Sequence, residues 1–78
     1  MINNAELLIH DAMMEYQNLV RKSKAKNITR EDTLNKIYKN LNAIEDGMDY
    51  IINNYELQPR TIRFVLPRWE QLKETRFA

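Results

Sequence analysis

The 78-residue chain contains no cysteine and a single histidine. Disulfide bonds are therefore excluded, and a zinc site would lack its commonest ligand. A chain of this length buries only about 60% of the surface that its unfolded form exposes, so its core is small. We expect one helical domain over residues 1–78 whose stability depends in part on a second copy of the chain or on a partner.

Glycine and proline are also scarce, with one and two residues respectively. So few glycines disfavour a β-rich fold, which needs many tight turns. No stretch approaches the roughly 18 apolar residues of a membrane span, and the start of the chain lacks the pattern of a signal peptide. We therefore expect a cytoplasmic protein without membrane association.

The side chains from which most enzyme sites are built are few. There is no cysteine nucleophile and no glycine-rich phosphate loop, and His10, four residues after Glu6, is best interpreted as a surface residue of an amphipathic helix. Glu45, Asp46 and Asp49 lie within about one helical turn, but one helix face offers too few oxygen ligands for a metal ion. We expect no catalytic residue, no metal and no cofactor.

Helical periodicity dominates what the sequence does contain. Between residues 29 and 58 the apolar residues recur at intervals of three and four, which predicts one long helix with Thr29 as its N-cap and Pro59 after its end. The stripe consists of Leu34, Ile37, Leu41, Ile44, Met48, Ile51 and Tyr55.

A second side of this long helix carries Ala43, Gly47 and Tyr50. The two small residues would let another helix approach closely, and Gly47 otherwise costs about 1 kcal/mol relative to alanine inside a helix. The pattern therefore predicts that the helix over residues 29–58 is the central one, contacted on two sides.

A broad apolar face predicts the first helix over residues 3–24. Asn3 is the expected N-cap, and Ile2 is expected to pack against Leu7. The face is wide enough for two neighbouring helices and consists of Ala5, Leu8, Ile9, Ala12, Met13, Tyr16, Leu19 and Val20.

The third element covers residues 59–77 and contains Pro67. The proline either kinks one helix or separates a turn over 59–66 from a helix over 67–77, and a strand over 61–66 is a further alternative. Phe64 falls off the apolar face of a continuous helix and so favours a break. The fold class is therefore all-α, an antiparallel hairpin of residues 3–24 and 29–58 with a Pro-broken third helix packed back, its core closed by Val65, Trp69 and Leu72.

Two groups of side chains have no role in this predicted core. Leu7 and Met14 lie nearly opposite the main apolar stripe of the first helix, and Glu45, Asp46 and Asp49 form an acidic run in the long helix. We favour a small non-enzymatic protein–protein interaction module, a regulator or inhibitor of a larger protein. Its size and composition are those of phage or mobile-element proteins, and a homodimer is a further candidate assembly. The candidate interface residues are Leu7, Met14, Glu45, Asp46, Asp49 and Tyr50.

The alternative function is a small nucleic-acid-binding transcriptional regulator. Residues 59–78 carry a net charge of +3 and residues 27–58 a net charge of −3. Basic and aromatic residues together are typical of nucleic-acid contacts, whereas the acidic middle segment would repel phosphate. The candidate contacts are Lys22, Lys24, Lys26, Arg60, Arg63 and Arg68.

Overall fold

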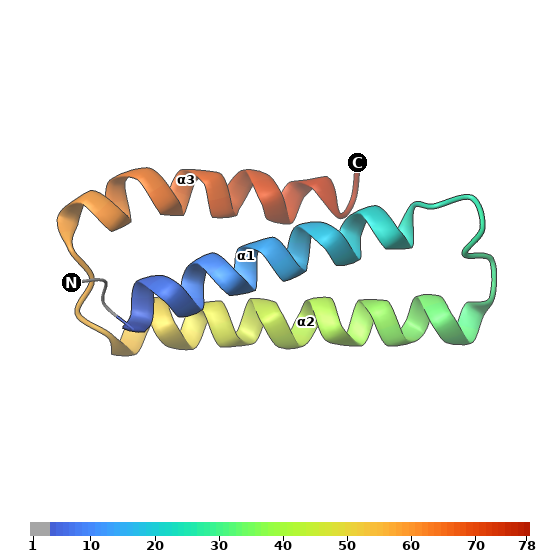
Figure 1. Cartoon of the computed structure of the whole chain (residues 1–78), viewed down its shortest axis with the longest axis horizontal. Coiled ribbons are helices and arrows are strands. Elements are labelled where there is room, and N and C mark those ends of the chain that lie inside the picture. Colours follow the sequence, from blue (N-terminus) through green and yellow to red (C-terminus); the bar gives the residue numbers. More distant parts are fainter. Residues whose placement is uncertain (1–3) are drawn as a thin grey trace.

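The computed structural model describes residues 4–78, which form three helices and, over that range, no strand. Helix α1 spans Asn4–Ser23, α2 spans Glu31–Asn54 and α3 spans Pro59–Thr75. The chain reverses direction at each connection, so α1 and α2 are antiparallel and α3 runs parallel to α1 (Figure 1). The molecule measures 42 × 20 × 18 Å and is elongated. The predicted all-α fold with a long helical hairpin is confirmed.

Helix α1 occupies the central position, with α2 on one side and α3 on the other (Figure 1). The backbones of α2 and α3 do not come into contact within the described part of the chain. The prediction that the helix over residues 29–58 is central is therefore wrong. The broad apolar face of α1 serves two neighbours, whereas the exposed side of α2 faces solvent.

A single hydrophobic cluster connects the three helices. Trp69 of α3 is 1% exposed, and its ring meets that of Tyr16 edge-on with the centroids 5.0 Å apart. Val65 and Leu72 pack against the cluster as predicted, whereas Tyr55 is exposed. The buried members of the cluster are Ile9, Tyr16, Val20, Ile37, Leu41, Met48 and Trp69.

The ends of α2 differ from their prediction. The N-cap is Arg30, which makes no side-chain capping bond, so the assignment of Thr29 as N-cap is wrong. The helix ends at Asn54, four residues before the predicted end, because Tyr55 is extended and Gln58 precedes Pro59. Ile2 and Asn3, the predicted staple and cap of the first helix, lie outside the described residues.

Helix α3 continues through Pro67, so the predicted break is absent, and the turn and strand alternatives for residues 59–66 are wrong. Pro67 and Arg63 are both exposed. The carbonyl group of Arg63, which loses its usual amide donor, can therefore bind water instead. The consequence of the unbroken helix is that Phe64 points away from the core and is 61% exposed.

Gly47 lies in the middle of α2, and a Cβ atom placed on it would have no neighbouring atom within 4 Å. Among residues 4–78 no helix uses the close approach that the glycine allows. We expect Gly47→Ala to raise the free energy of unfolding by about 0.5–1 kcal/mol, because alanine has the higher helix propensity. Urea unfolding followed by far-UV circular dichroism measures the change.

Ala43→Gly, one helical turn earlier on the same exposed side, is the matched control for this substitution. It should lower the free energy of unfolding by a similar amount. A loss of stability in Gly47→Ala would contradict the open environment of the glycine.

Candidate functional site

A groove of about 600 Å³ lies between α1 and α3. It follows α1 from Glu6 to Gln17 and α3 from Thr61 to Thr75. Helices α1 and α3 run side by side in the same direction, and each forms one wall of the groove (Figure 1). The apolar lining residues are Ile9, Met13, Met14, Val65 and Leu72.

The two helices that form this groove also carry exposed apolar side chains. Leu7, Met14 and Phe64 are 46%, 48% and 61% exposed. Leu7 lies two turns before Met14 on the same side of α1, and Phe64 lies one turn before Arg68, which also lines the groove. Apolar side chains of the groove lining and exposed apolar side chains of the same two helices are therefore left uncovered by the described residues.

The polar residues of the groove differ in their partners. The Thr61 hydroxyl donates a hydrogen bond of 2.7 Å to a Glu6 carboxylate oxygen, which ties the start of α3 to the start of α1. His10 lies 3.7 Å from the carboxylate of Asp11, and both side chains are exposed. Arg68 has no carboxylate partner among the described residues. Its positive charge is therefore free to meet a ligand.

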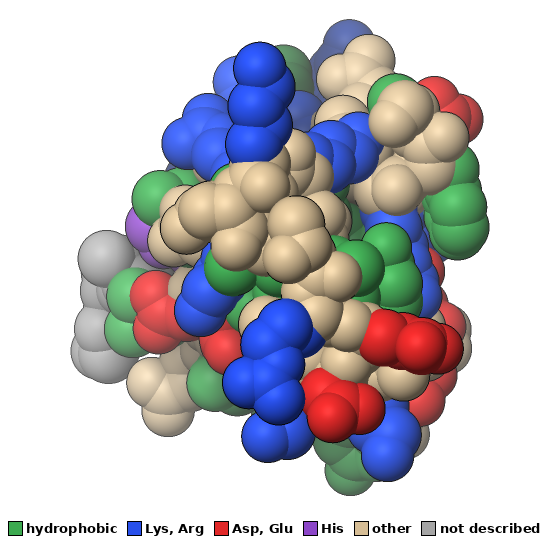
Figure 2. Space-filling view, turned by 90° about the vertical axis from the view of Figure 1, so that its right-hand side faces the viewer, with side chains coloured by type: hydrophobic (Ala, Val, Ile, Leu, Met, Phe, Trp, Pro, Cys, Tyr) green, Lys and Arg blue, Asp and Glu red, His purple; other side chains and the backbone are tan. Residues whose placement is uncertain are grey.

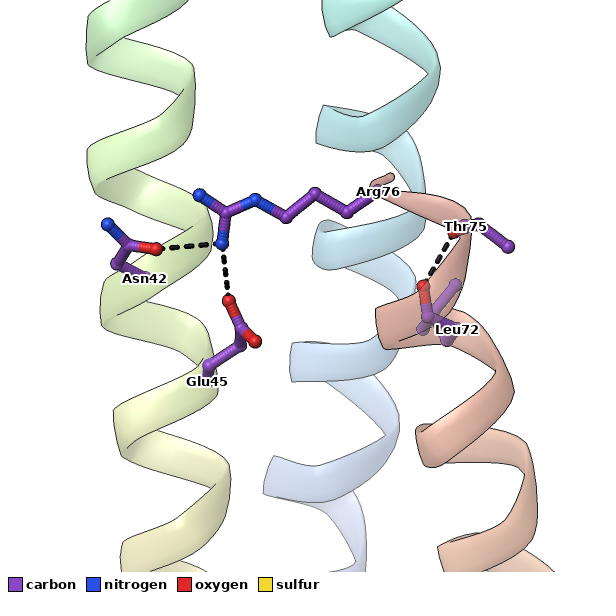
Figure 3. A network of polar contacts seen from close by, with 5 residues as sticks. All are labelled: Asn42, Glu45, Leu72, Thr75 and Arg76. Atoms are coloured by element: carbon purple, nitrogen blue, oxygen red, sulfur yellow. Dashed lines mark hydrogen bonds and ion pairs between the residues drawn. The ribbon is translucent and has the colours of Figure 1, made fainter. Parts of the chain in front are cut away.

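The side chain of Arg76 reaches from the end of α3 across to α2 (Figure 3). Its guanidinium group donates hydrogen bonds of 2.6 Å to Glu45 and 2.7 Å to Asn42. The same group lies 5.6 Å from the ring centroid of Tyr38. Glu45, a predicted interface residue, is thus occupied by an internal ion pair that links the two outer helices.

Lys24, in the connection after α1, makes a second link to the end of α3. Its ammonium group donates hydrogen bonds to the carbonyl oxygens of Thr75 and Ala78, the latter at 2.9 Å. A cation at a helix C-terminus satisfies free carbonyl groups and interacts favourably with the helix dipole. This predicted nucleic-acid contact therefore has a role within the fold.

The remaining predicted site residues fall into separate places. Asp46, Asp49 and Tyr50 lie on α2 and are exposed, away from the groove, and the ring of Tyr50 meets that of Tyr55 edge-on at 6.5 Å. The predicted protein interface is therefore split between α1 and α2, with only Met14 in the lining of the groove.

The predicted basic residues are also divided. Lys22, Lys24 and Lys26 lie where α1 ends, whereas Arg60 and Arg63 begin α3 at the opposite end of the long axis (Figure 1). Figure 2 views the end that carries the α1–α2 connection and shows Lys and Arg side chains there with acidic side chains among them. The two basic groups do not form one continuous surface.

The Tyr16 hydroxyl is buried beneath these links and has no hydrogen-bond partner among the described residues. Burial raises the pKa of this hydroxyl above its usual value, the charge of Glu45 adds to the rise, and Arg76 opposes it. The pKa of Lys73 is also raised, chiefly by its hydrogen bond to Glu70. Stability should therefore fall as the pH rises from about 10, near the unfolded-state pKa values, through the folded values. For Tyr16 the cause is the cost of a buried phenolate, and for Lys73 it is the loss of the charged bond to Glu70.

We expect Tyr16→Phe to leave the free energy of unfolding at pH 7 unchanged or to raise it by up to about 1 kcal/mol, because it removes a buried hydroxyl without a partner. The loss of stability above about pH 10 should become shallower, with Lys73 still contributing. Urea unfolding at several pH values from 7 to 11 measures both effects. Tyr50→Phe, at an exposed position, should change neither. A loss above 1 kcal/mol at pH 7 would show that the hydroxyl has a partner in the folded protein.

Within residues 4–78 no three potential ligands among His, Asp and Glu are grouped so as to hold a metal ion. Over the same residues, none of the helices combines the length and apolar character that crossing a membrane requires.

The sequence pattern indicated Leu7 and Met14 as unexplained by the core but did not reveal the groove beside them. Val65 and Leu72 were predicted only as core residues, and each also lines the groove. Phe64 was the signal in the sequence that could have pointed to this side of the third helix. It falls off the apolar face because α3 is continuous, and its aromatic ring is therefore exposed. No family model, curated protein or solved structure matches this chain.

Proposed function

We propose that this chain is a small non-enzymatic protein-interaction module that binds a larger protein through the groove between α1 and α3. The observation that carries the proposal is the groove with its apolar lining residues, together with the exposed side chains of Leu7, Met14 and Phe64 on the same two helices. Large contiguous apolar surfaces on small proteins are typical of binding sites. Occupying a surface of its partner would make the chain a regulator or inhibitor.

Site-specific photocrosslinking in the native host tests this proposal. A benzophenone amino acid in place of Phe64 should form a covalent product with a partner protein, and Met14→Glu in the same chain should abolish that product. The matched control carries the crosslinker in place of Tyr50, which is 62% exposed on α2. A product from position 50 alone would move the interface to the acidic side of α2, and crosslinking to nucleic acid would contradict the proposal.

The alternative proposal is a nucleic-acid-binding regulator that uses α3. Arg60, Arg63 and Arg68 support it, since all three are exposed and have no carboxylate partner within the described chain. Binding of this kind would weaken steeply as salt rises. The double variant Arg60→Glu, Arg63→Glu would abolish it, whereas Met14→Glu would have little effect.

A further inference from the structure

The shape of the groove suits an extended, rod-like ligand. From Glu6 to Gln17 it follows α1 for about three helical turns, on the order of 17 Å at about 1.5 Å per residue. Its walls are two parallel helices, and ridges of side chains on such helices accept a further helix in the space between them. A partner helix of about three turns would fill this length.

The chemistry of the lining favours the apolar face of such a helix. Ile9, Val65 and Leu72 form part of the lining, and Met13 and Met14 lie beside them. Methionine side chains are flexible and adapt to differently shaped apolar partners. Recognition of an amphipathic helix by an apolar groove is a recurring mode in which residues at intervals of three and four enter the groove.

The lining of the groove carries one basic and one acidic side chain. On the α3 side this is Arg68, which has no carboxylate partner among the described residues. On the α1 side Glu6 already accepts a hydrogen bond from Thr61, and Asp11 lies 3.7 Å from His10. A ligand with carboxylates on the side facing α3 would therefore be favoured over one with cations there.

We infer that the groove binds an amphipathic helix of a partner protein that carries Asp or Glu on the flank of its apolar face that lies toward Arg68. This inference rests on the proposed function and specifies its partner. A second copy of the chain does not fit as the occupant. Its acidic helix is α2, whose apolar stripe is already packed against α1 through Ile37, Leu41 and Met48.

A displayed library of 16-residue helical peptides tests the inference on the full chain. All members share one apolar face, and the flanking positions vary among Asp, Glu, Lys, Arg, Ser and Gln. We expect selection to enrich Asp and Glu on one flank. A labelled peptide of the enriched sequence, measured by fluorescence anisotropy, should bind more weakly as salt rises.

Three variants locate the binding site of the enriched peptide. Met14→Glu should raise its Kd by at least about tenfold, because it places a charge in the apolar groove. Arg68→Glu should raise the Kd by about three- to tenfold, as expected for reversing one exposed charge. Lys39→Glu makes the same charge change on the exposed side of α2 and should leave the Kd unchanged. Circular dichroism checks that each variant remains folded.

The outcomes separate this inference from the proposed function. Enrichment of basic flanks, or of none, with binding still lost in Met14→Glu would overturn the acidic partner and leave the interaction groove in place. Peptide binding that is indifferent to Met14→Glu would overturn both. A dimer of the free chain that Met14→Glu dissociates, seen by light scattering, would show that the occupant is a second copy and would overturn the inference.

Discussion

Trp69→Ala should lower the free energy of unfolding by about 3–5 kcal/mol, as removal of a buried aromatic side chain does. Trp69 is 1% exposed, packs edge-on against Tyr16 and is the only large side chain of α3 that is fully buried. A loss of that size is a large fraction of the stability of a small domain, so α3 and the groove that it forms should be lost with it. Urea unfolding followed by far-UV circular dichroism measures the effect, since the substitution removes the one tryptophan.

Phe64→Ala is the matched control on the same helix, because it also truncates an aromatic ring but at an exposed position. It should change the free energy of unfolding by no more than about 0.5 kcal/mol. A loss below about 1 kcal/mol in Trp69→Ala would show that α3 is not docked on α1 and would remove the structural basis of the groove.

Arg76→Ala should lower the free energy of unfolding by about 1.5–3 kcal/mol, the range for hydrogen bonds to charged groups. The Arg76 side chain is only 14% exposed, and its removal leaves Glu45 partly buried without its cation. The contact with the ring of Tyr38 is lost as well. A double-mutant cycle with Glu45→Ala should give a coupling energy between about 0.5 and 3 kcal/mol.

Glu70→Ala provides the comparison for Arg76→Ala. It breaks the 3.0 Å pair with Lys73, in which the Glu70 side chain is 66% exposed, and should cost about 0.2–0.5 kcal/mol. If Arg76→Ala costs no more than this exposed pair, the link between α3 and α2 does not stabilise the fold. Raised salt should weaken the exposed pair more than the Arg76–Glu45 pair.

The candidate site was only partly accessible to sequence reasoning. Leu7 and Met14 were recognised because a helical repeat shows directly which residues fall outside the apolar face. The groove beside them needs α3 to lie parallel to α1, although the two helices are separated in sequence by the whole of α2. Glu45 looked available on its own helix and proved to be paired with Arg76, a residue 31 positions away. Such pairings have no local signature.

The sequence by itself determined that the chain is all-α, where its first two helices lie to within four residues, and that Trp69 and the repeat members Ile37, Leu41 and Met48 are buried. These properties follow from local periodicity, since a 3.6-residue repeat decides which side chains share a face. Only the tertiary structure decided that α1 is central and that α3 passes unbroken through an outward-facing Pro67. It also decided that a groove remains between α1 and α3. The physical reason is that helix order depends on how three broad faces pack together, a comparison of whole surfaces that no single segment contains.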